Sequence, residues 1–413
     1  MHAKKRAHTE RKGYKFALIS YTFITFILST LLGCVQSPQY SSNKPSFKQD
    51  IQLLSIHYKP VVLKSDKQAI IVLPELQGRI MSATLAGQNA NAIGWFNREY
   101  LKQPHTQRNA VIGGVQRLIY GPETGQFSQF FQPNSGTTAD DIYYQNAITF
   151  QNFNIAQQSA KHVKLTAPIT LTNHAGYTFN FDLTRNITLL SQAETEKLLS
   201  IQLPESIEYV SYGSQDEIIH TGNSPWTKKT GLVSLWTLAA YQSNDNMTAI
   251  IPFKGELKSV TPYFNETKKS HTKIIKPFVF YRADGEYMNK IGIPVNNTRP
   301  YLAAYDSYNQ RLTIEYFHIS NKENRNYLTA SWITPKDAYN GEIVNIFNDG
   351  PDDFGHYFGH FFELEASSAA FELAPGESQK HFHYSFHFSG EKNKLNQIAK
   401  QVLGLSLDDV SQP

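Results

Sequence analysis

Two glutamates placed two residues apart are the first feature of this sequence that could do chemistry. Glu363 and Glu365 lie in the apolar stretch "FFELE", which begins at residue 361. Side chains of a β-strand alternate between its two faces, so both carboxylates would point to one face, with Cα atoms about 7 Å apart. Buried together in a dry interior they would repel, and one would have to be neutral. We therefore expect this face to border a hydrated surface, where a partly desolvated carboxylate can act as an acid or a base.

A glycine-rich segment carries the next candidate residues. The stretch "GGVQRLIYGPETGQFSQFF", residues 113–131, holds Arg117 and Glu123. Glycines on both sides of a charged residue are typical of a loop that contacts a ligand, and the apolar "LIY" predicts that Arg117 leaves a buried strand. The alternative is a set of turns with a surface ion pair, which contributes less than about 1 kcal/mol. We favour ligand binding for Arg117 and Glu123.

A histidine and two tryptophans follow in residues 218–238. His220 ends an apolar run, and a histidine there can donate a hydrogen bond or a proton. Tryptophan rings stack on the C–H faces of sugars, and the chain has only four of them. Trp226 follows a proline in a polar loop, so we expect it to be exposed and to contact a ligand. Trp236 lies in "LVSLWTL", so we expect it in the core.

A third group of polar residues lies between residues 287 and 365. Lys290, Asp306 and Asn348 each stand beside apolar strand residues or a tight glycine turn. We group them with Arg117, Glu123, Trp226 and Glu363 as candidate ligand-binding residues.

Alternating histidines raise the question of a metal. The last predicted strand, "HFHYSFHF", places His381, His383 and His387 on one face, and such histidines can ligate a metal. A solvated face over an aromatic core is the interpretation that we favour. We therefore predict no metal site and no cofactor.

The elements that must position these residues are nearly all strands. From residue 51 onward, short apolar or alternating runs are separated by turns, and the clearest are at 69–85, 162–173, 177–190, 232–241, 247–253, 276–284, 311–319 and 381–390. Only residues 391–405 have the apolar period of a helix. No change of composition divides 51–413, so we predict a mainly β protein, one large two-sheet sandwich with a short C-terminal helix. A β-propeller is the alternative, but it should show a repeat of roughly 40–50 residues.

The N-terminus has the pattern of a targeting segment. The net charge of +4 comes from a basic tip, which is followed by the apolar residues 16–33 and by Cys34, the only cysteine. "LLGC" resembles the bacterial lipobox, in which the cysteine is lipidated and becomes the mature N-terminus. An uncleaved anchor helix is the alternative, since the apolar segment nearly suffices to span a bilayer. We predict a lipoprotein signal peptide over 1–33, a lipid-anchored flexible tether over 34–50 and one domain over 51–413.

The partners and the location follow from the same segment and from the composition. The residues after Cys34 are Val35 and Gln36, and neither is an aspartate. By resemblance to Gram-negative lipoproteins, this favours a protein that is attached to the outer membrane through lipidated Cys34 and faces the periplasm. A lone cysteine at the anchor allows no disulfide within the mature domain. Basic patches interleaved with aromatics are missing, so nucleic acid is not an expected partner. We expect a monomer.

Several motifs together resemble a known family. "PELQGRIMSATL", "GGVQRLIYGPETGQFS", "PWTKKTGLVSLW", "KIGIP" and "FELEASSAAFELAPGES", between about residues 69 and 405, are similar to an uncharacterised bacterial family related to galactose mutarotases (aldose 1-epimerases). The resemblance implies a β-supersandwich whose concave face, in relatives, holds a monosaccharide. It also implies that Glu365 would be the catalytic base, with Glu363 next, that His220 would be the acid, and that Arg117 would grip the sugar. The usual "NHxYFNL" motif is absent.

Three functions remain open on this basis. The first is a lipid-anchored protein that binds carbohydrate without strong catalysis. The second is an epimerase or mutarotase that uses a glutamate base and a histidine acid. The third is a structural or assembly lipoprotein. Glycoside hydrolysis is disfavoured, because two carboxylates side by side on one strand do not straddle a glycosidic bond.

Overall fold

The computed structural model describes residues 44–103, 111–323, 325–329, 338–352 and 355–413. These residues form one compact unit, Lys44–Pro413. Cys34, the signal peptide and most of the tether lie outside the described residues, so lipidation stays a prediction. The folded unit begins earlier than the expected boundary at residue 51, because helix α1 (Phe47–Leu54) already includes residues 47–50. None of the described helices is long and apolar enough to cross a membrane.

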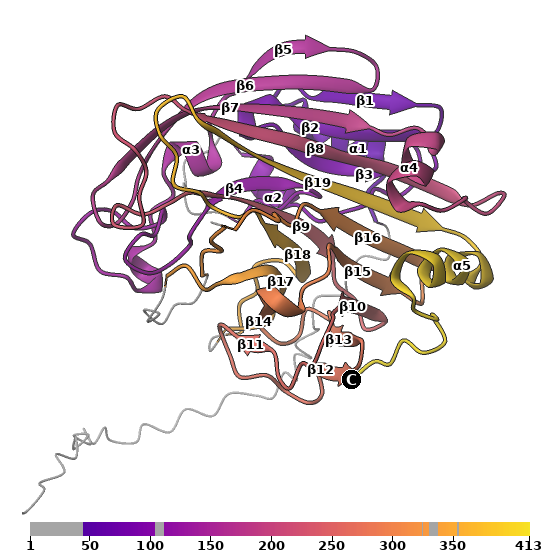
Figure 1. Ribbon diagram of the computed structural model, residues 1–413. Helices are drawn as coiled ribbons and strands as arrows, with labels where there is room; N and C mark the ends of the chain where they lie inside the picture. The colour runs from indigo at the N-terminus through magenta and orange to yellow at the C-terminus, as the bar shows by residue number, and fades with distance from the viewer. Residues whose placement is uncertain (1–43, 104–110, 324, 330–337, 353–354) are drawn as a thin grey trace, which may run out of the picture. The chain divides into compact units, whose positions relative to one another are not determined.

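The larger layer of the fold is an antiparallel sheet of ten strands among the described residues (Figure 1). Its order is β12 (Thr272–Ile275), β13 (Phe278–Arg282), β10 (Met247–Pro252), β15 (Tyr301–Asp306), β16 (Arg311–Phe317), β19 (Ser378–Ser389), β8 (Glu208–His220), β7 (Thr178–Leu189), β6 (His162–Thr172) and β5 (Asn154–Gln158). Strands expected from alternation, such as 162–173 and 177–190, are therefore confirmed as β6 and β7.

The second layer combines two smaller antiparallel sheets. A six-stranded sheet has the order β11 (Thr261–Pro262), β14 (Asn289–Pro294), β17 (Glu342–Asn348), β18 (Phe361–Ser367), β9 (Ser234–Gln242) and β4 (Arg117–Gly121), and a three-stranded sheet has the order β1 (Val61–Ser65), β2 (Gln68–Leu73) and β3 (Arg79–Thr84). Ile80 and Gln116 join them through reciprocal backbone hydrogen bonds of 3.0 and 3.1 Å. The predicted two-layer β-sandwich is thus confirmed.

The main hydrophobic core lies between these two layers. In β7, alternate residues Phe179, Phe181 and Leu183 are at most 1% exposed and point into it. From the other layer, Leu364 and Ile346 do the same. Each such side chain contributes roughly 1.5–3 kcal/mol by leaving water, so this core dominates the stability of the sandwich.

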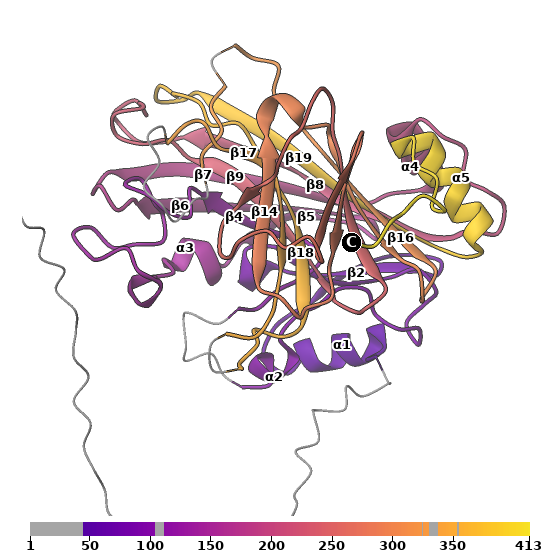
Figure 2. The ribbon, with the colours of Figure 1, turned by 90° about the horizontal axis from the view of Figure 1, so that it is seen from below.

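A second core covers the outer face of the ten-stranded sheet. Helices α4 (Gln192–Leu199) and α5 (Lys392–Leu403) lie next to each other in both views (Figures 1 and 2). Leu395 and Ile398 of α5 belong to the same buried cluster as Phe386 and Phe388 of β19. The C-terminal helix is therefore confirmed, and its apolar period is explained by this packing.

Helices α1 and α4 were not expected from the apolar pattern, and both begin with a capping box. Ser46 and Gln49 in α1, and Ser191 and Glu194 in α4, exchange side-chain and backbone hydrogen bonds at the helix start. This S-x-x-[EQ] signal is readable in a sequence. The remaining helical turns are short: α2 (Arg98–Leu101), α3 (Asn146–Thr149) and the 3₁₀ turns Pro74–Leu76, Ala139–Asp141 and Val295–Asn297.

The histidine face of β19 points into the sandwich, so the expectation of a solvated face is wrong. His381, His383 and His387 are at most 2% exposed. Glu315 accepts hydrogen bonds from His383 Nε2 (2.8 Å), from Ser385 Oγ (2.6 Å) and from the Tyr241 hydroxyl. Buried polar groups are tolerated when they are paired in this way.

His387 is held by hydroxyl groups. Its two ring nitrogens lie 2.9 Å from the hydroxyls of Tyr212 and Thr313, and burial lowers its pKa to about 3. In the described part of the chain, no three His, Cys, Asp or Glu side chains are arranged to hold a metal.

A buried ion pair joins β7 and β8 of the ten-stranded sheet, and its arginine also reaches the connection between β2 and β3. Arg185 Nε lies 2.9 Å from Asp216 Oδ1, and both side chains are fully buried. The same guanidinium donates through Nη1 to the carbonyl of Gln77 at 3.1 Å. Losing either charge would leave the other uncompensated away from water.

We predict that Asp216→Ala destabilises the fold by about 3–5 kcal/mol, because it strands the Arg185 charge in the core. Asp182→Ala, on the exposed side of neighbouring β7, is the matched control and should change the free energy of unfolding by less than about 0.5 kcal/mol. Urea denaturation followed by tryptophan fluorescence measures both. Equal effects of the two substitutions would contradict this role of the pair.

Candidate functional site

One face of the six-stranded sheet carries a row of polar side chains. Glu365 of β18 pairs with Asn345 of β17 on one side and with Leu238 of β9 on the other, and Leu238 pairs with Arg117 of β4. Directly paired residues of neighbouring strands share a face. By the same alternation, Glu363 joins this row, and Leu364 between the two glutamates points into the main core. We call this side of the sheet the polar face; its charged members are Arg117, Lys290, Glu363 and Glu365.

The most buried part of the polar face is an ion pair. Lys290 Nζ of β14 lies 2.9 Å from Glu365 Oε2, and the two side chains are 3% and 1% exposed. Trp236 of β9 donates its indole N–H to the same carboxylate at 3.1 Å. The Lys290 ammonium also lies 4.4 Å from the centre of the Trp236 ring. A cation and a hydrogen-bond donor thus offset the cost of burying the Glu365 charge.

The loop after β4 adds a second carboxylate. Glu123 Oε2 lies 3.6 Å from Lys290 Nζ, and the Glu123 side chain is 24% exposed. Burial alone would lower the pKa of Lys290, but the carboxylates of Glu365 and Glu123 raise it above its ordinary value. Lys290 is therefore positively charged at neutral pH.

Glu363 has a different environment from Glu365. It is half-buried, and no described cation lies within ion-pair distance of its carboxyl group. Burial, and then the Glu365 carboxylate, raise the pKa of Glu363 to about 8, although Arg117 and Lys290 act in the opposite direction. Glu363 therefore holds a proton at neutral pH. Burial also raises the pKa of Glu365, and there Lys290 opposes the shift.

Two arginines lie at the other end of the polar face. Arg117 is half-buried, and its Nη2 donates to the Ile148 carbonyl at 3.4 Å. Arg79 of β3 is fully buried, and its Nη1 donates to the Gly113 carbonyl at 2.9 Å. Gly114 has φ +117°, and a Cβ there would lie 2.9 Å from the Ile80 carbonyl oxygen. The glycine-rich segment thus allows the chain to run against β3 beside Arg79.

The structure brings five of the predicted site residues together, and these are Arg117, Glu123, Lys290, Glu363 and Glu365. Half-buried Arg117, Glu123 and Glu363 form its accessible rim, with Tyr144 beside Arg117. Sequence reasoning missed Arg79 and the role of Trp236, which is buried as expected but bonds to Glu365. An arginine directly after Gly78 in an otherwise uncharged strand was the signal for Arg79.

His220 does not join the polar face in any described hydrogen bond or ion pair. Its Nδ1 accepts from the Gly222 N–H at 2.9 Å, and its Nε2 donates to the Ser224 carbonyl at 2.8 Å. A carbonyl only accepts, so the imidazole is neutral with its proton on Nε2. Both nitrogens are occupied, and in this arrangement neither is free for a ligand.

Trp226 is 1% exposed, so the expectation of an exposed sugar-stacking ring is wrong. The centre of its ring lies 4.8 Å from that of His220, and the two rings are stacked. The ring centres of Phe179 and Phe181 lie 5.2 and 5.8 Å from it, in edge-to-face contact. The Trp226 backbone N–H donates to the Leu373 carbonyl at 2.9 Å. This bond folds the polar loop back and places the ring in the core.

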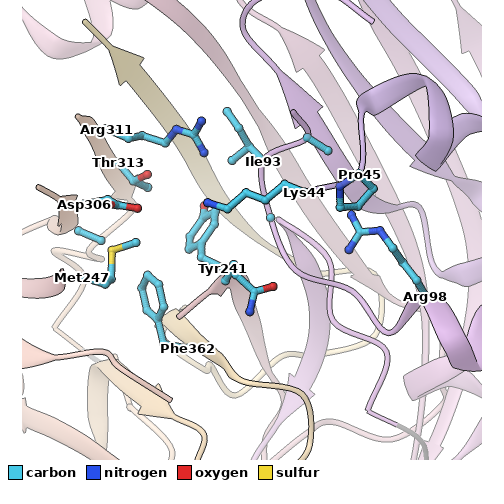
Figure 3. Close-up of a pocket in the computed structure, with 14 residues that line it drawn as sticks. Lys44, Pro45, Ile93, Arg98, Tyr241, Met247, Asp306, Arg311, Thr313 and Phe362 are labelled. Carbon is cyan, nitrogen blue, oxygen red and sulfur yellow. The ribbon is translucent and has the colours of Figure 1, made fainter. Parts of the chain in front are cut away.

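Asp306 and Asn348 lie elsewhere. Asn348 bonds to Asp284, Gly285 and Tyr287 and fixes a turn. Asp306 accepts from Asn244 and Asn309. It lines a separate cavity of about 60 Å³ between the layers, where Figure 3 draws it among Lys44, Arg311, Thr313, Tyr241 and Met247.

Comparisons with known proteins give a family and several distant structures. The model of a family described as "Family of unknown function (DUF6786)" matches residues 45–413. None of the curated proteins matches the chain.

Three solved structures are similar to it. A protein of Escherichia coli K12, described provisionally as an aldose 1-epimerase, is 12% identical over 81% of this chain and 99% of its own, with a TM-score of 0.48. Slr1438 protein from Synechocystis sp. PCC 6803 is 13% identical over 81% and 97%, with a TM-score of 0.48. A galactose mutarotase related enzyme from Lactobacillus acidophilus is 8% identical over 80% and 98%, with a TM-score of 0.44. Nothing about the chemistry of this chain follows from similarity at this level.

We predict that Glu363→Gln changes how stability depends on pH. The folded protein keeps the Glu363 proton up to about pH 8, whereas the unfolded chain releases it near the ordinary value of 4.5. The wild type therefore loses stability as pH rises between these values. A pKa shift of one unit corresponds to about 1.4 kcal/mol. Because Glu363 is half-buried and solvent weakens the effect, we expect the wild type to lose roughly 1–3 kcal/mol more of its free energy of unfolding over this pH range than Glu363→Gln does.

Urea denaturation at pH 5 and pH 8.5 tests this prediction. The control is Glu205→Gln, since Glu205 is exposed and its substitution should leave the wild-type pH dependence in place. Parallel pH profiles for wild type and Glu363→Gln would show that the carboxyl is ionised in the folded protein.

Proposed function

We propose that this chain, which belongs to the family of unknown function DUF6786, binds carbohydrate at the polar face. The observation that carries the proposal is the convergence of Arg117, Glu123, Lys290, Glu363 and Glu365 from separate strands and a loop on one side of a sheet. Sugars present many hydroxyl groups, which need closely spaced donors and acceptors with fixed positions. The sequence motifs, which resemble those of a mutarotase-related family, imply the same kind of ligand.

Binding without strong catalysis fits the state of Glu365 best. The carboxylate already accepts from Lys290 and Trp236 and is 1% exposed. The Lys290 cation at 2.9 Å opposes the rise in pKa that burial causes, so this carboxylate is a weaker proton acceptor with the pair intact than it would be without the cation. The histidine expected to act as the acid has both nitrogens occupied. Neither member of the implied base–acid pair is therefore ready to react.

An enzyme of the mutarotase type is the second candidate, and Glu363 favours it. This carboxyl is protonated near neutral pH, two residues from a carboxylate that is paired with a cation. Neighbouring carboxyls held in different protonation states are a frequent basis for acid–base catalysis. In this alternative, Glu363 would protonate the ring oxygen of the sugar as the bond from C1 to that oxygen breaks, and Glu365, after separating from Lys290, would accept the proton of the anomeric hydroxyl.

We predict that Glu365→Gln distinguishes the two candidates. In a binding protein the substitution changes the affinity for sugar by about tenfold, and there is no turnover to lose. In an enzyme it abolishes ring interconversion while the sugar still binds. Isothermal titration calorimetry on the full chain in detergent, with a panel of monosaccharides and oligosaccharides, measures binding. NMR exchange between anomers measures turnover.

Glu205→Gln is the control, because Glu205 is exposed and belongs to no described ion pair. Absence of binding across the panel would contradict both candidates and would favour a structural or assembly lipoprotein. Equal sugar binding by Glu365→Gln and Glu205→Gln would contradict the binding candidate, and turnover that survives in Glu365→Gln would contradict the enzyme candidate.

We also propose that the protein is a lipoprotein anchored through Cys34, in the outer membrane and facing the periplasm. The support is the basic tip, the apolar residues 16–33 and the lipobox-like "LLGC". We predict that Cys34→Ser abolishes incorporation of labelled palmitate and leaves an uncleaved precursor. Cleavage that persists in Cys34→Ser would contradict lipidation, and a wild type that is neither cleaved nor labelled with palmitate would favour an uncleaved anchor helix.

A further inference from the structure

Charge is distributed unevenly along the polar face. At one end, Lys290 lies between Glu365 at 2.9 Å and Glu123 at 3.6 Å, so two carboxylates face its one positive charge and no cation is left unpaired there. At the other end, Arg79 and Arg117 form no ion pair with any described residue. The one carboxyl group whose charge acts on both is that of Glu363.

The arginine end also has hydrogen-bond donors without acceptors. Arg79 is fully buried, yet its Nε and Nη2 have no partner among the described residues, and neither has the buried Nε of Arg117. A buried charged donor without an acceptor is costly, and each such group calls for an explanation. Arg117 is half-buried, so its guanidinium can meet a molecule that arrives from solvent.

The state of Glu363 does not remove this excess of positive charge. With its proton, Glu363 adds nothing to the balance and can donate a hydrogen bond to an anion. Ionised, it would neutralise only one of the two arginines. A guanidinium presents donors in a planar fork that matches the oxygens of a carboxylate or a phosphate.

We propose that the carbohydrate bound at the polar face carries an anionic group, which docks against Arg117 while Arg79 adds its charge from below. This inference rests on the proposed carbohydrate function and narrows it to acidic sugars, such as uronic acids or sugar phosphates. The neutral part of the ligand lies toward Glu123 and the Glu365–Lys290 pair. Arg79 acts only through its charge, because its side chain is not exposed.

Calorimetric titration of the full chain in detergent tests this proposal with matched ligands. The pairs are glucose with glucuronate and galactose with galacturonate, and the corresponding 6-phosphates separate a carboxylate from a phosphate. We expect the acidic member to bind at least about tenfold more tightly at low salt. Because the attraction is electrostatic, the preference should shrink as NaCl rises from 50 to 500 mM, which can be measured on the wild type alone.

Arg117→Gln should reduce the ratio of acidic to neutral affinity to about one. Arg299→Gln is the matched control, since Arg299 is exposed and has no described ion pair, and it should keep the wild-type ratio. Thermal denaturation of each variant verifies that it is folded. If Arg117→Gln does not fold, the wild type still tests the preference for acidic sugars, since a preference that does not shrink between 50 and 500 mM NaCl would contradict electrostatic recognition of the anion.

The outcomes separate this inference from the proposed function. Neutral sugars that bind as tightly as their acidic partners would overturn the inference and leave the proposed function standing. An acid preference that survives in Arg117→Gln would overturn the assignment to the arginine end. Failure of every sugar, neutral and acidic, would overturn the proposed function itself.

Discussion

The alternation of side chains along paired strands is the constraint on which the rest of this structure depends. Because β4, β9, β18 and β17 are in register, Arg117, Glu365 and Asn345 fall on one side of the sheet. The residues between them, such as Leu364, fall on the other side and build the main core. A slip of one residue in this register would send the glutamates into the core and the leucine into the polar face. The core therefore fixes the site.

Burial of charge then decides the chemistry of that face. Glu365 and Lys290 are almost inaccessible to water, and each is tolerable only because the other lies 2.9 Å away. Glu363 has no such partner, so its burial is accommodated by a proton. Two identical residues of one strand thus have different electrostatic environments, because only Glu365 has a cation beside it. Arg79 and Arg117 at the far end have neither an oppositely charged partner in ion-pair contact nor a change of protonation to offset their burial. For this reason we propose that an anionic ligand pairs with them.

The sequence predicted the strands and the shared face of Glu363 and Glu365, because alternation is a local property that survives in the fold. It also singled out Arg117, Glu123 and Lys290 as candidate site residues, because they stand beside glycines or apolar strand residues, and the structure brings these three together. It did not predict which side of β19 is solvated, since a row of histidines alternates equally well inside and outside. His383 and His387 are inside because Glu315 and hydroxyl groups from other strands pair with them, whereas the buried ring nitrogens of His381 have no partner among the described residues. Trp226 was misplaced for a related reason, because one long-range backbone bond to Leu373 folds its polar loop inward. Arg79 lies beside the polar face through the contact of β3 with the glycine-rich segment; its position after Gly78 marks it as unusual, but the contact itself depends on the fold.

The most direct test of the central claim, that ligand binds at the polar face, is the indole N–H resonance of Trp236 in a ¹⁵N-labelled protein during titration with acidic and neutral sugars. This N–H donates to Glu365, whereas Trp226 lies in the core beside His220 and serves as an internal reference. The account predicts that the Trp236 resonance shifts progressively with ligand while the Trp226 resonance stays in place. Sugar binding that leaves the Trp236 resonance unchanged, or that moves the Trp226 resonance in its stead, would contradict it.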